Sequence, residues 1–197
     1  MHVYVVFAHP SSTSLLKEVL DAFTSGLREA GHTYEIGNLY EMEFQSDMDI
    51  IQYQREIAWI PEAPVPDDVL KEHEKIARAE ALAFIYPVWW SDCPAKLKGW
   101  FDRVWNYGYA YYYDGNAQRQ TEIRIKKAIV LCTAGHTREH LEETGIAESI
   151  RRIMLNDRLY GVGIPEASME ILGGMLPGLD ACKEINLMRA FESGKNL

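Results

Sequence analysis

The chain has 197 residues, 47% of them hydrophobic and 11% aromatic, and its 29 acidic against 20 basic side chains give a formal net charge of -9. This composition excludes an intrinsically disordered chain, and the acidic balance argues against DNA or RNA as the main partner, because nucleic-acid binding depends on Lys and Arg. No apolar run reaches the roughly 18 residues of a membrane span, and the length fits one domain covering residues 1–197.

The first part of the chain alternates strand and helix patterns. Residues 3–8 are almost continuously apolar, which predicts a strand buried on both faces. Apolar side chains then recur with helical spacing over residues 15–27, and Gly31 follows at a position typical of a helix end. A weaker strand pattern covers residues 33–39. Pro66, with two aspartates behind it, predicts the start of another helix.

The second part of the chain repeats this alternation. Apolar runs over residues 81–88 and 128–133 predict two more buried strands, and residues 166–172 predict the last one. The helices expected after these strands cover residues 97–105, 146–159 and 179–191. The complete alternation predicts a doubly wound α/β fold, in which helices cover both faces of a five-stranded parallel sheet.

Residues 41–65 form the one long connection in this pattern. Loops longer than about 12–15 residues are uncommon and usually functional. This segment contains Trp59, Ile60, Pro61 and Pro64, so we expect it to be stiff and partly apolar. It is either a surface excursion that packs on its own domain, or a lid or dimer arm.

Cysteine usage indicates the cellular compartment. Cys93, Cys132 and Cys182 are odd in number and widely spaced, and they form neither a CxxC motif nor a Cys/His cluster. The strand at residues 3–8 also begins too early for a signal peptide with a basic n-region. We therefore expect reduced thiols, no bound metal and a cytoplasmic location.

The residues that follow each strand matter most, because open α/β sheets bind ligands outside the carboxyl ends of their strands. After the first strand comes His9-Pro10-Ser11-Ser12-Thr13-Ser14, which leads into a helix and contains no glycine. The missing glycines exclude the GxGxxG and P-loop motifs at this position. Hydroxyls, backbone amides and a helix start are the ingredients of a phosphate site. A simple helix cap and a strand-end histidine are the alternatives.

A more specific segment follows the third strand. Pro87 and Pro94 frame the adjacent Trp89 and Trp90, so the backbone is constrained where the two indoles are presented. A planar aromatic cofactor would lie against such a wall. The alternative, that both indoles belong to the core, is weakened by their place between a strand and a helix.

Small residues mark the end of the fourth strand. Thr133-Ala134-Gly135 would let backbone amides approach a ligand closely. This motif is weak by itself. It gains weight because it is the third strand end that is expected at the same crevice.

Five motifs together carry a family resemblance: His9, Thr13-Ser14, Pro87-x-x-Trp90, Pro94-Ala-x-Leu-Lys-Gly-Trp-Phe-x-Arg-Val and Thr133-x-Gly135. They resemble the flavodoxin-like-fold NAD(P)H:quinone oxidoreductases of the DT-diaphorase type and related small bacterial flavoproteins, from Met1 to about Gly174. The resemblance implies a homodimer that binds flavin non-covalently. It also implies ping-pong transfer of two electrons from NAD(P)H to quinones or similar planar acceptors. The shorter middle loop favours FMN, with FAD as the alternative.

The resemblance also implies roles for individual residues. Those expected around the phosphate end of the flavin are His9, Thr13, Ser14, Leu15 and Leu16. Those expected to line the isoalloxazine ring are Pro87, Val88, Trp89 and Trp90. The backbone expected at the pyrimidine edge is that of Thr133, Ala134 and Gly135, where amide donors would stabilise the negative charge of the reduced ring.

A tyrosine-rich segment supplies the substrate-binding candidates. In the family that this sequence resembles, tyrosines at the positions of Tyr111 and Tyr113 come from the partner subunit and cover the substrate. Without the family, such a run is typical of a half-buried interface or strand. The two interpretations are compatible.

The sequence departs from the family pattern after Gly135. Larger members carry a tyrosine and then a histidine there, and this pair accepts the charge change of hydride transfer. Here His140 and Ala147 occupy or adjoin those positions. His140 is therefore a candidate catalytic residue, with a solvated helix-end histidine as the alternative. Arg138 is a candidate for the NADPH phosphate.

Two other functional classes share the expected fold. A flavodoxin-type electron carrier would have a first loop without His-Pro and no Pro-x-x-Trp block, unlike this chain. A flavin-binding regulatory subunit of a membrane channel is the other alternative, and no feature of the sequence favours it.

Overall fold

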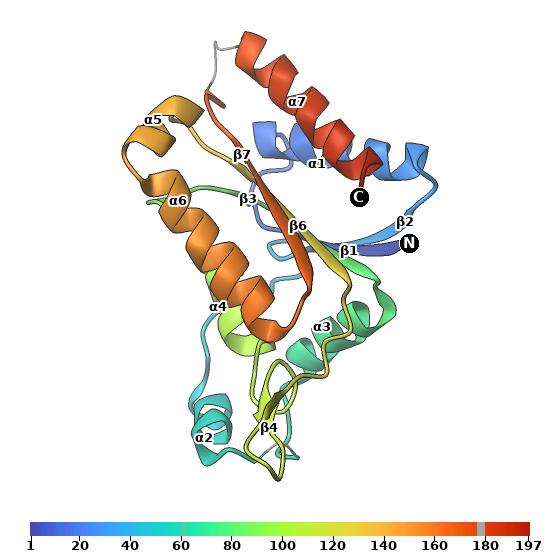
Figure 1. The fold of residues 1–197 in the computed structure, drawn as a ribbon, viewed down its shortest axis with the longest axis vertical. Helices are drawn as coiled ribbons and strands as arrows, with labels where there is room; N and C mark the ends of the chain where they lie inside the picture. Colours follow the sequence, from blue (N-terminus) through green and yellow to red (C-terminus); the bar gives the residue numbers. More distant parts are fainter. Residues whose placement is uncertain (61, 177–179) are drawn as a thin grey trace.

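A computed structural model describes residues 1–60, 62–176 and 180–197. Five parallel strands form the central sheet in the order β2-β1-β3-β6-β7 (Figure 1). Their bounds are β1 His2–Phe7, β2 Thr33–Asn38, β3 Ala81–Pro87, β6 Lys127–Thr133 and β7 Glu166–Leu172. Each predicted strand is present within a residue or two at each end. The strand order is the flavodoxin-like one, which confirms the expected fold class.

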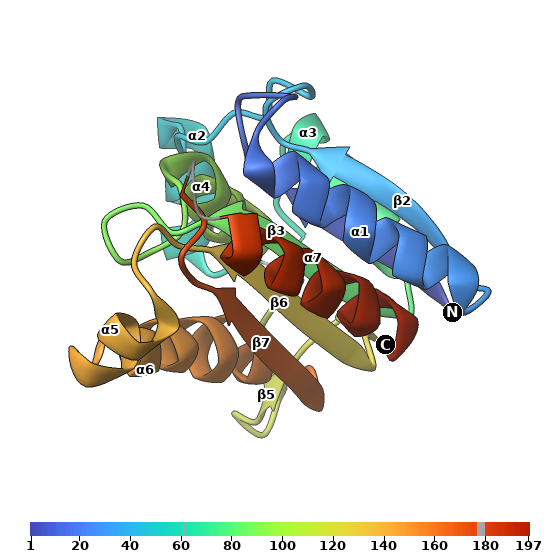
Figure 2. The same cartoon turned by 90° about the horizontal axis from the view of Figure 1, so that it is seen from above.

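Helices cover both faces of the sheet (Figure 2). On one face lie α1 (Leu15–Glu29) and α7 (Asp180–Lys195). The other face carries α3 (Asp67–Arg78), α4 (Ala95–Val104) and α6 (Ile146–Arg151), which continues as the π-helical segment η1 (Arg152–Leu159) and the short 3₁₀ turn η2 (Tyr160–Val162). The helix predicted over 179–191 is confirmed from residue 180, since residue 179 lies outside the described residues.

The core consists of two layers because strand side chains alternate between faces. In β1, Val3, Val5 and Phe7 pack under α1 and α7. Tyr4 and Val6 point to the opposite layer, under α3 and α4. This double burial is the physical reason why the strands are continuously apolar in sequence.

The two helices on the first face approach each other closely. A Cβ atom at Gly26 of α1 would lie 2.0 Å from the carbonyl oxygen of Phe191 in α7. A Cβ atom at Gly194 would lie 2.1 Å from the carbonyl oxygen of Phe23. Neither helix could sit here with a larger residue at its crossing position.

A buried carboxylate fastens the helices of the second face. Glu72 of α3 is fully buried and accepts hydrogen bonds from the Tyr4 hydroxyl, from Trp100 Nε1 at 2.7 Å and from Lys75 Nζ at 2.7 Å. Burial, the Glu72 charge and its hydrogen bond raise the pKa of Tyr4 far above its ordinary value. One side chain thereby ties α3 to β1 and α4.

The long connection differs from its expectation. Residues 41–65 contain a helix, α2 (Ile50–Ala58), whose first turn is capped by Asp49. Trp59 ends the helix in a left-handed conformation with a φ of 56°. The expectation at Pro61 lies outside the described residues. Beside α2 lies a two-stranded hairpin, β4 (Tyr112–Tyr113) and β5 (Arg119–Gln120), at the bottom of Figure 1.

Candidate functional site

Two cavities open along the carboxyl edge of the sheet. One, of about 550 Å³, is lined by residues that follow β3, β6 and β7: Val88, Trp90, Ser91, Ala134, Gly135, His136, Leu141, Ile146 and Leu176. The other, of about 370 Å³, is lined by residues that follow β1 and β2: His9, Pro10, Ser12, Asn38, Tyr40 and Glu41. They flank the β1/β3 junction, where the strand order reverses and ligands of such folds bind.

The segment after β1 is held rigidly by its own hydrogen bonds. The Ser11 N–H donates to His9 Nδ1 at 3.0 Å, and the Thr13 N–H donates to Ser11 Oγ at 3.2 Å. Ser14 caps α1 by accepting from the Lys17 N–H at 3.2 Å, so its simple capping role is real. The first N–H groups of a helix lack intrahelical partners.

The two leucines expected at this end contribute differently from the polar residues. Leu16 is buried in the core and Leu15 packs against it. Their side chains therefore belong to the fold, and only their backbone N–H groups in the first turn of α1 could meet a phosphate.

The Trp89–Trp90 segment forms a tight hairpin turn. Trp89 and Asp92 exchange backbone hydrogen bonds, with N···O distances of 2.9 and 3.2 Å. The two residues between them, Trp90 and Ser91, have φ angles of 49° and 65°. Positive φ at both central positions is the geometry of a type I′ turn, which favours Asn and Gly. Trp and Ser adopt it at a cost in backbone strain, a feature that clusters at functional sites.

The turn presents its aromatic surface to solvent. The Trp90 side chain is fully exposed and Trp89 is 43% exposed. The Trp89 ring lies 6.2 Å from the His9 ring between centroids, so the segments after β1 and β3 meet. Neither indole is in the core, and the core alternative is therefore wrong.

The Thr133-Ala134-Gly135 backbone is only partly free to bind a ligand. The Ala134 N–H donates to the Leu172 carbonyl at 3.0 Å, and the Thr133 carbonyl accepts from the Val88 N–H at 2.7 Å. These bonds fasten β6 to β7 and to the start of the tryptophan turn. The expectation that all three residues bind a ring edge is corrected for the Ala134 amide, and the exposed Gly135 becomes the main backbone candidate.

The histidines after β6 are arranged differently from the expectation. His136 lines the larger cavity, whereas His140 is exposed on α5 (Arg138–Glu143) and stacks on His136 with ring centroids 4.5 Å apart. Ala147 is buried. Sequence reasoning missed His136, although its place directly after Gly135 was a usable signal.

The candidate substrate tyrosines lie away from these cavities. Tyr113 stacks on Trp59, with ring centroids 5.9 Å apart, and Tyr111 lines a separate cavity of about 480 Å³ beside α4. In Figure 1 their hairpin and α2 occupy the end of the molecule opposite α5. Within one chain, Tyr111 and Tyr113 therefore do not cover the tryptophan turn.

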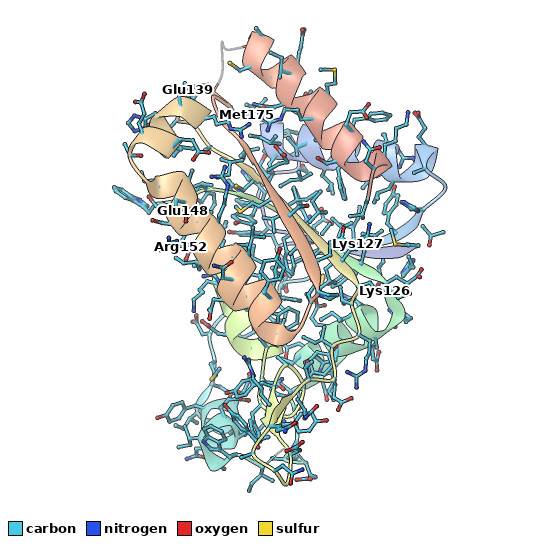
Figure 3. All side chains as sticks on the ribbon, viewed as in Figure 1. Lys126, Lys127, Glu139, Glu148, Arg152 and Met175 are labelled. Atoms are coloured by element: carbon cyan, nitrogen blue, oxygen red, sulfur yellow. The ribbon has the colours of Figure 1, made fainter. Side chains whose placement is uncertain are left out.

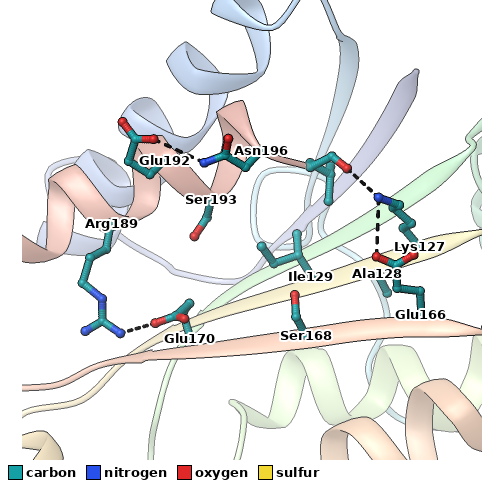
Figure 4. Close-up of a pocket in the computed structure, with 11 residues that line it drawn as sticks. Lys127, Ala128, Ile129, Glu166, Ser168, Glu170, Arg189, Glu192, Ser193 and Asn196 are labelled. Carbon is teal, nitrogen blue, oxygen red and sulfur yellow. Dashed lines mark hydrogen bonds and ion pairs between the residues drawn. The ribbon is translucent and has the colours of Figure 1, made fainter.

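A further cavity lies at the opposite, amino-terminal edge of the sheet (Figure 4). It measures about 400 Å³, and four of its charged side chains pair with one another, while Glu192 accepts a hydrogen bond from Asn196 at 3.3 Å. Lys127 pairs with Glu166 at 3.4 Å, and Arg189 pairs with Glu170. Charges already paired in this way offer little to a ligand.

Residues 1–60, 62–176 and 180–197 contain no group of three or more His, Cys, Asp and Glu placed to hold a metal ion. Within the same residues, no helix is long and apolar enough to cross a membrane.

The chain is similar to known proteins in both sequence and structure. The family described as having a flavodoxin-like fold matches residues 1–186. The structure of an NAD(P)H:quinone oxidoreductase from Methanothermobacter marburgensis is 63% identical, with a TM-score of 0.95, over 100% of this chain and 95% of that one.

Two curated relatives are more distant. A ribosyldihydronicotinamide dehydrogenase-like protein, traD, of Penicillium crustosum is 30% identical over 173 residues, which cover 78% of this chain and 65% of that protein. NAD(P)H dehydrogenase (quinone) 1 of Cavia porcellus is 28% identical over 201 residues, which cover 86% of this chain and 73% of that protein.

Proposed function

We propose that this chain, which belongs to the NAD(P)H:quinone oxidoreductases of the flavodoxin-like fold family, transfers two electrons from NAD(P)H through a bound flavin to quinones or similar planar acceptors. The observation that carries the proposal is the Trp90 indole, fully exposed on a strained turn beside the larger cavity. A large aromatic side chain held in water at a cost in strain is explained when a flat ligand covers it.

The remaining edge of the sheet fits the other parts of a flavin. His9, Thr13, Ser14 and the first turn of α1 would hold the phosphate end, through hydroxyls and backbone N–H groups. Pro87, Val88 and Trp89 would continue the wall made by Trp90, and Gly135 would meet the pyrimidine edge. The two cavities at this edge measure about 550 and 370 Å³, and each lies within the range of small-molecule and cofactor sites.

Flavin, when bound, supplies the hydride chemistry. The chain itself contributes stacking at Trp90, a backbone donor at Gly135 and an imidazole, His136, at the wall of the cavity. Such an imidazole can donate a hydrogen bond to a bound ligand. His140, stacked on His136, would support that ring rather than contact the ligand. In this proposal, donor and acceptor use the same cavity in turn.

The proposal includes a homodimer, for which α2 is the main support. This helix exposes Ile50, Ile51, Tyr53 and Ile57, and the adjacent Trp59 stacks on Tyr113. An exposed apolar patch rimmed by polar residues marks an interaction surface. A second copy would cover this patch and could carry Tyr111 and Tyr113 to a cavity that they do not reach within their own chain.

Light scattering tests the dimer directly. We expect a dimeric mass at micromolar concentration, and a shift to monomer when Ile51 and Ile57 are both replaced by Lys, because charges would then be buried at the interface. Circular dichroism of the double variant checks that it remains folded. A monomeric wild-type protein would contradict this part of the proposal.

The identity of the flavin and the location are finer parts of the same proposal. We propose FMN, with FAD as the alternative, and a location in the cytoplasm. Heat release and chromatography of the bound flavin identify it. Recovery of FAD alone would overturn the FMN assignment and leave the proposed reaction intact.

One experiment separates the enzyme from an electron carrier. The purified protein, loaded with FMN and given NADPH and menadione, is expected to oxidise NADPH without any added reductase. A carrier would need a separate reductase, so activity that appears only after a reductase is added would contradict the proposal. Co-purification with a membrane channel would instead favour the regulatory-subunit alternative.

A further inference from the structure

Arg158 is a buried arginine directly behind the tryptophan turn. It lies in η1, 66 residues after Asp92 in the chain. Only 7% of its surface is exposed. Its Nη1 and Nη2 atoms donate to the two carboxylate oxygens of Asp92, at 3.0 and 3.1 Å. Asp92 is the last residue of the turn, so the pair ties a distant helix to this loop.

The same guanidinium group makes further contacts that fix its position. Nη1 donates to the Cys93 sulfur at 3.4 Å, and the guanidinium carbon lies 5.1 Å from the centre of the Phe101 ring. The Arg158 carbonyl accepts from Trp105 Nε1 at 2.8 Å. A planar fork with two parallel bonds holds direction as well as distance, which a lysine could not do.

The Asp92 carboxylate is correspondingly well held. Its Oδ1 atom also accepts from the Cys93 N–H at 2.7 Å. Burial disfavours its charge, but the hydrogen bonds from Arg158 and Cys93 outweigh burial and keep the pKa of Asp92 below its ordinary value. Burial raises the pKa of Cys93 to about 12, so the neighbouring thiol stays neutral.

The local backbone explains why Arg158 can reach the turn. The α-helical α6 changes to π-helical geometry at Arg152 and keeps it to Leu159. π-helical turns are rare in proteins overall, and those that occur are frequently found at functional sites. They place the Arg158 side chain against Asp92 and its carbonyl against Trp105 at the same time.

A strained turn persists only where contacts with the surrounding structure hold its backbone in that conformation. Two residues with positive φ, Trp90 and Ser91, need such support. The Val88 N–H anchors the chain before the turn by donating to the Thr133 carbonyl. The Asp92–Arg158 pair anchors it after the turn.

We propose that Arg158 is a positioning residue for the flavin site, which acts through Asp92 to hold the Trp90 indole ready for a planar ligand. It touches neither donor nor acceptor. The proposal rests on the proposed function for the identity of that ligand, whereas the mechanical part, support of the turn, concerns this chain alone.

The first test needs no flavin. In Arg158→Met, we expect the amide hydrogens of Trp89 and Asp92, which bond across the turn, to exchange at least about tenfold faster, because the turn opens locally. The Ala134 amide, bonded to Leu172 at the same edge, serves as the internal reference and is expected to keep its rate. Equal acceleration at all three amides would show a general loss of stability and overturn the proposal.

The second test measures binding. FMN fluorescence titration of Arg158→Met is expected to give a Kd raised about tenfold, or ~1.4 kcal/mol. Arg158→Lys, which keeps the charge and loses the paired geometry, is expected to fall between wild type and Arg158→Met. The matched control is Arg152→Met, which removes an exposed arginine of the same segment, paired with Glu148 at 2.7 Å (Figure 3), and should leave the Kd unchanged.

A double variant separates positioning from a general effect. If Arg158 acts through the indole, then adding Arg158→Met to Trp90→Ala should raise the Kd by less than about twofold, since the two changes remove the same contact. A full tenfold rise in that background would overturn the proposal. If Arg158→Met fails to fold, Asp92→Asn, which keeps the Cys93 contact and loses the charge pair, takes its place in all three measurements.

The two proposals fail in different ways. A wild-type protein that binds neither FMN nor FAD would end the proposed function, while the exchange experiment would still decide the support of the turn. A wild-type protein that binds FMN, with Arg158→Met binding equally tightly, would end this inference alone.

Discussion

Two helices of this molecule show opposite relations to their own chain. In α1, the apolar residues point inward, and Phe23 is 0% exposed. In α2, polar Gln52 is 1% exposed whereas Ile51 is 74% exposed. Gln52 is accommodated because it exchanges hydrogen bonds with Arg103, at 2.9 and 3.0 Å. The packing of one chain explains α1 completely, but it explains only the polar side of α2.

The contrast extends to the site. Like the apolar side of α2, the Trp90 indole has no packing partner among the described residues, although its backbone is tightly anchored. Apolar surfaces that are held in place by the fold and remain exposed are typical of binding sites. In the proposed function, a second copy of the chain would cover α2 and the flavin would cover Trp90.

The largest expected effect tests the core side of the comparison. Phe23→Ala should lower the free energy of unfolding by about 3–5 kcal/mol, because it empties a buried aromatic site. Ile51→Ala should lower it by less, with a loss that depends on protein concentration because it acts on association. Urea unfolding at two protein concentrations measures both. A loss for Ile51→Ala that is large and independent of concentration would break the comparison.

The next effect is a pH dependence of stability, expected where His73 packs against Tyr109 of the tyrosine-rich segment. His73 of α3 stacks on Tyr109 at 3.6 Å between ring centroids and bonds the Val104 carbonyl through Nε2 at 3.0 Å. Burial lowers the pKa of His73 to about 4. The neutral form is favoured in the folded state, so its contribution to stability is present above pH 6.5 and is lost as the pH falls towards 4.

The size of this loss can be measured by unfolding at several pH values. A shift from about 6.5 to about 4 corresponds to at most roughly 3 kcal/mol. His73→Phe, which keeps a stacking ring and cannot titrate, should flatten this part of the stability curve. If the wild-type and His73→Phe curves fall in parallel between pH 7 and pH 4, the assignment to His73 is wrong.

A smaller effect is expected at the tryptophan turn. Trp90→Ala should weaken flavin binding by about 1–3 kcal/mol, the range for a large aromatic contact, with little change in stability, since this side chain is exposed. Tyr160→Ala is the control, because Tyr160 is an exposed aromatic residue on η2 that lines neither cavity at this edge. Equal flavin affinity in Trp90→Ala and Tyr160→Ala would remove the main support for the site.

The last comparison separates the two histidines. Loss of an acid–base group costs roughly 10²–10⁴-fold in rate, and loss of a supporting contact costs less. His136 lines the cavity, whereas His140 stacks on the His136 ring. Stopped-flow flavin reduction should therefore slow more in His136→Ala than in His140→Ala. The reverse order would give His140 the direct role that the sequence suggested. Rates within about twofold of wild type in both variants would leave backbone donors such as Gly135 as the stabilising groups.

Much of the fold was predictable because its signals are local. The buried strands are continuous apolar runs, and α1 has a regular apolar stripe, so both were found with nearly correct bounds. Helix α2 was missed, since its apolar residues and the nearby prolines suggested a stiff loop, although Asp49 is a readable helix cap.

The site was predictable in part for a similar reason. Strand ends can be located from sequence, so the three segments at the carboxyl edge were identified. The Arg158–Asp92 pair, 66 residues apart in the chain, could not be found, because only the packing of η1 behind α4 brings the two side chains together. Likewise, nothing local shows that the Ala134 amide is already bonded to Leu172.

The most direct test of the central claim is steady-state kinetics with the FMN-loaded protein. NADPH oxidation is measured while the menadione concentration is varied at several fixed NADPH concentrations. If donor and acceptor use one cavity in turn, the double-reciprocal lines will be parallel, as in other ping-pong reactions. Intersecting lines would contradict the shared cavity, and a protein that neither takes up flavin nor oxidises NADPH would contradict the account as a whole.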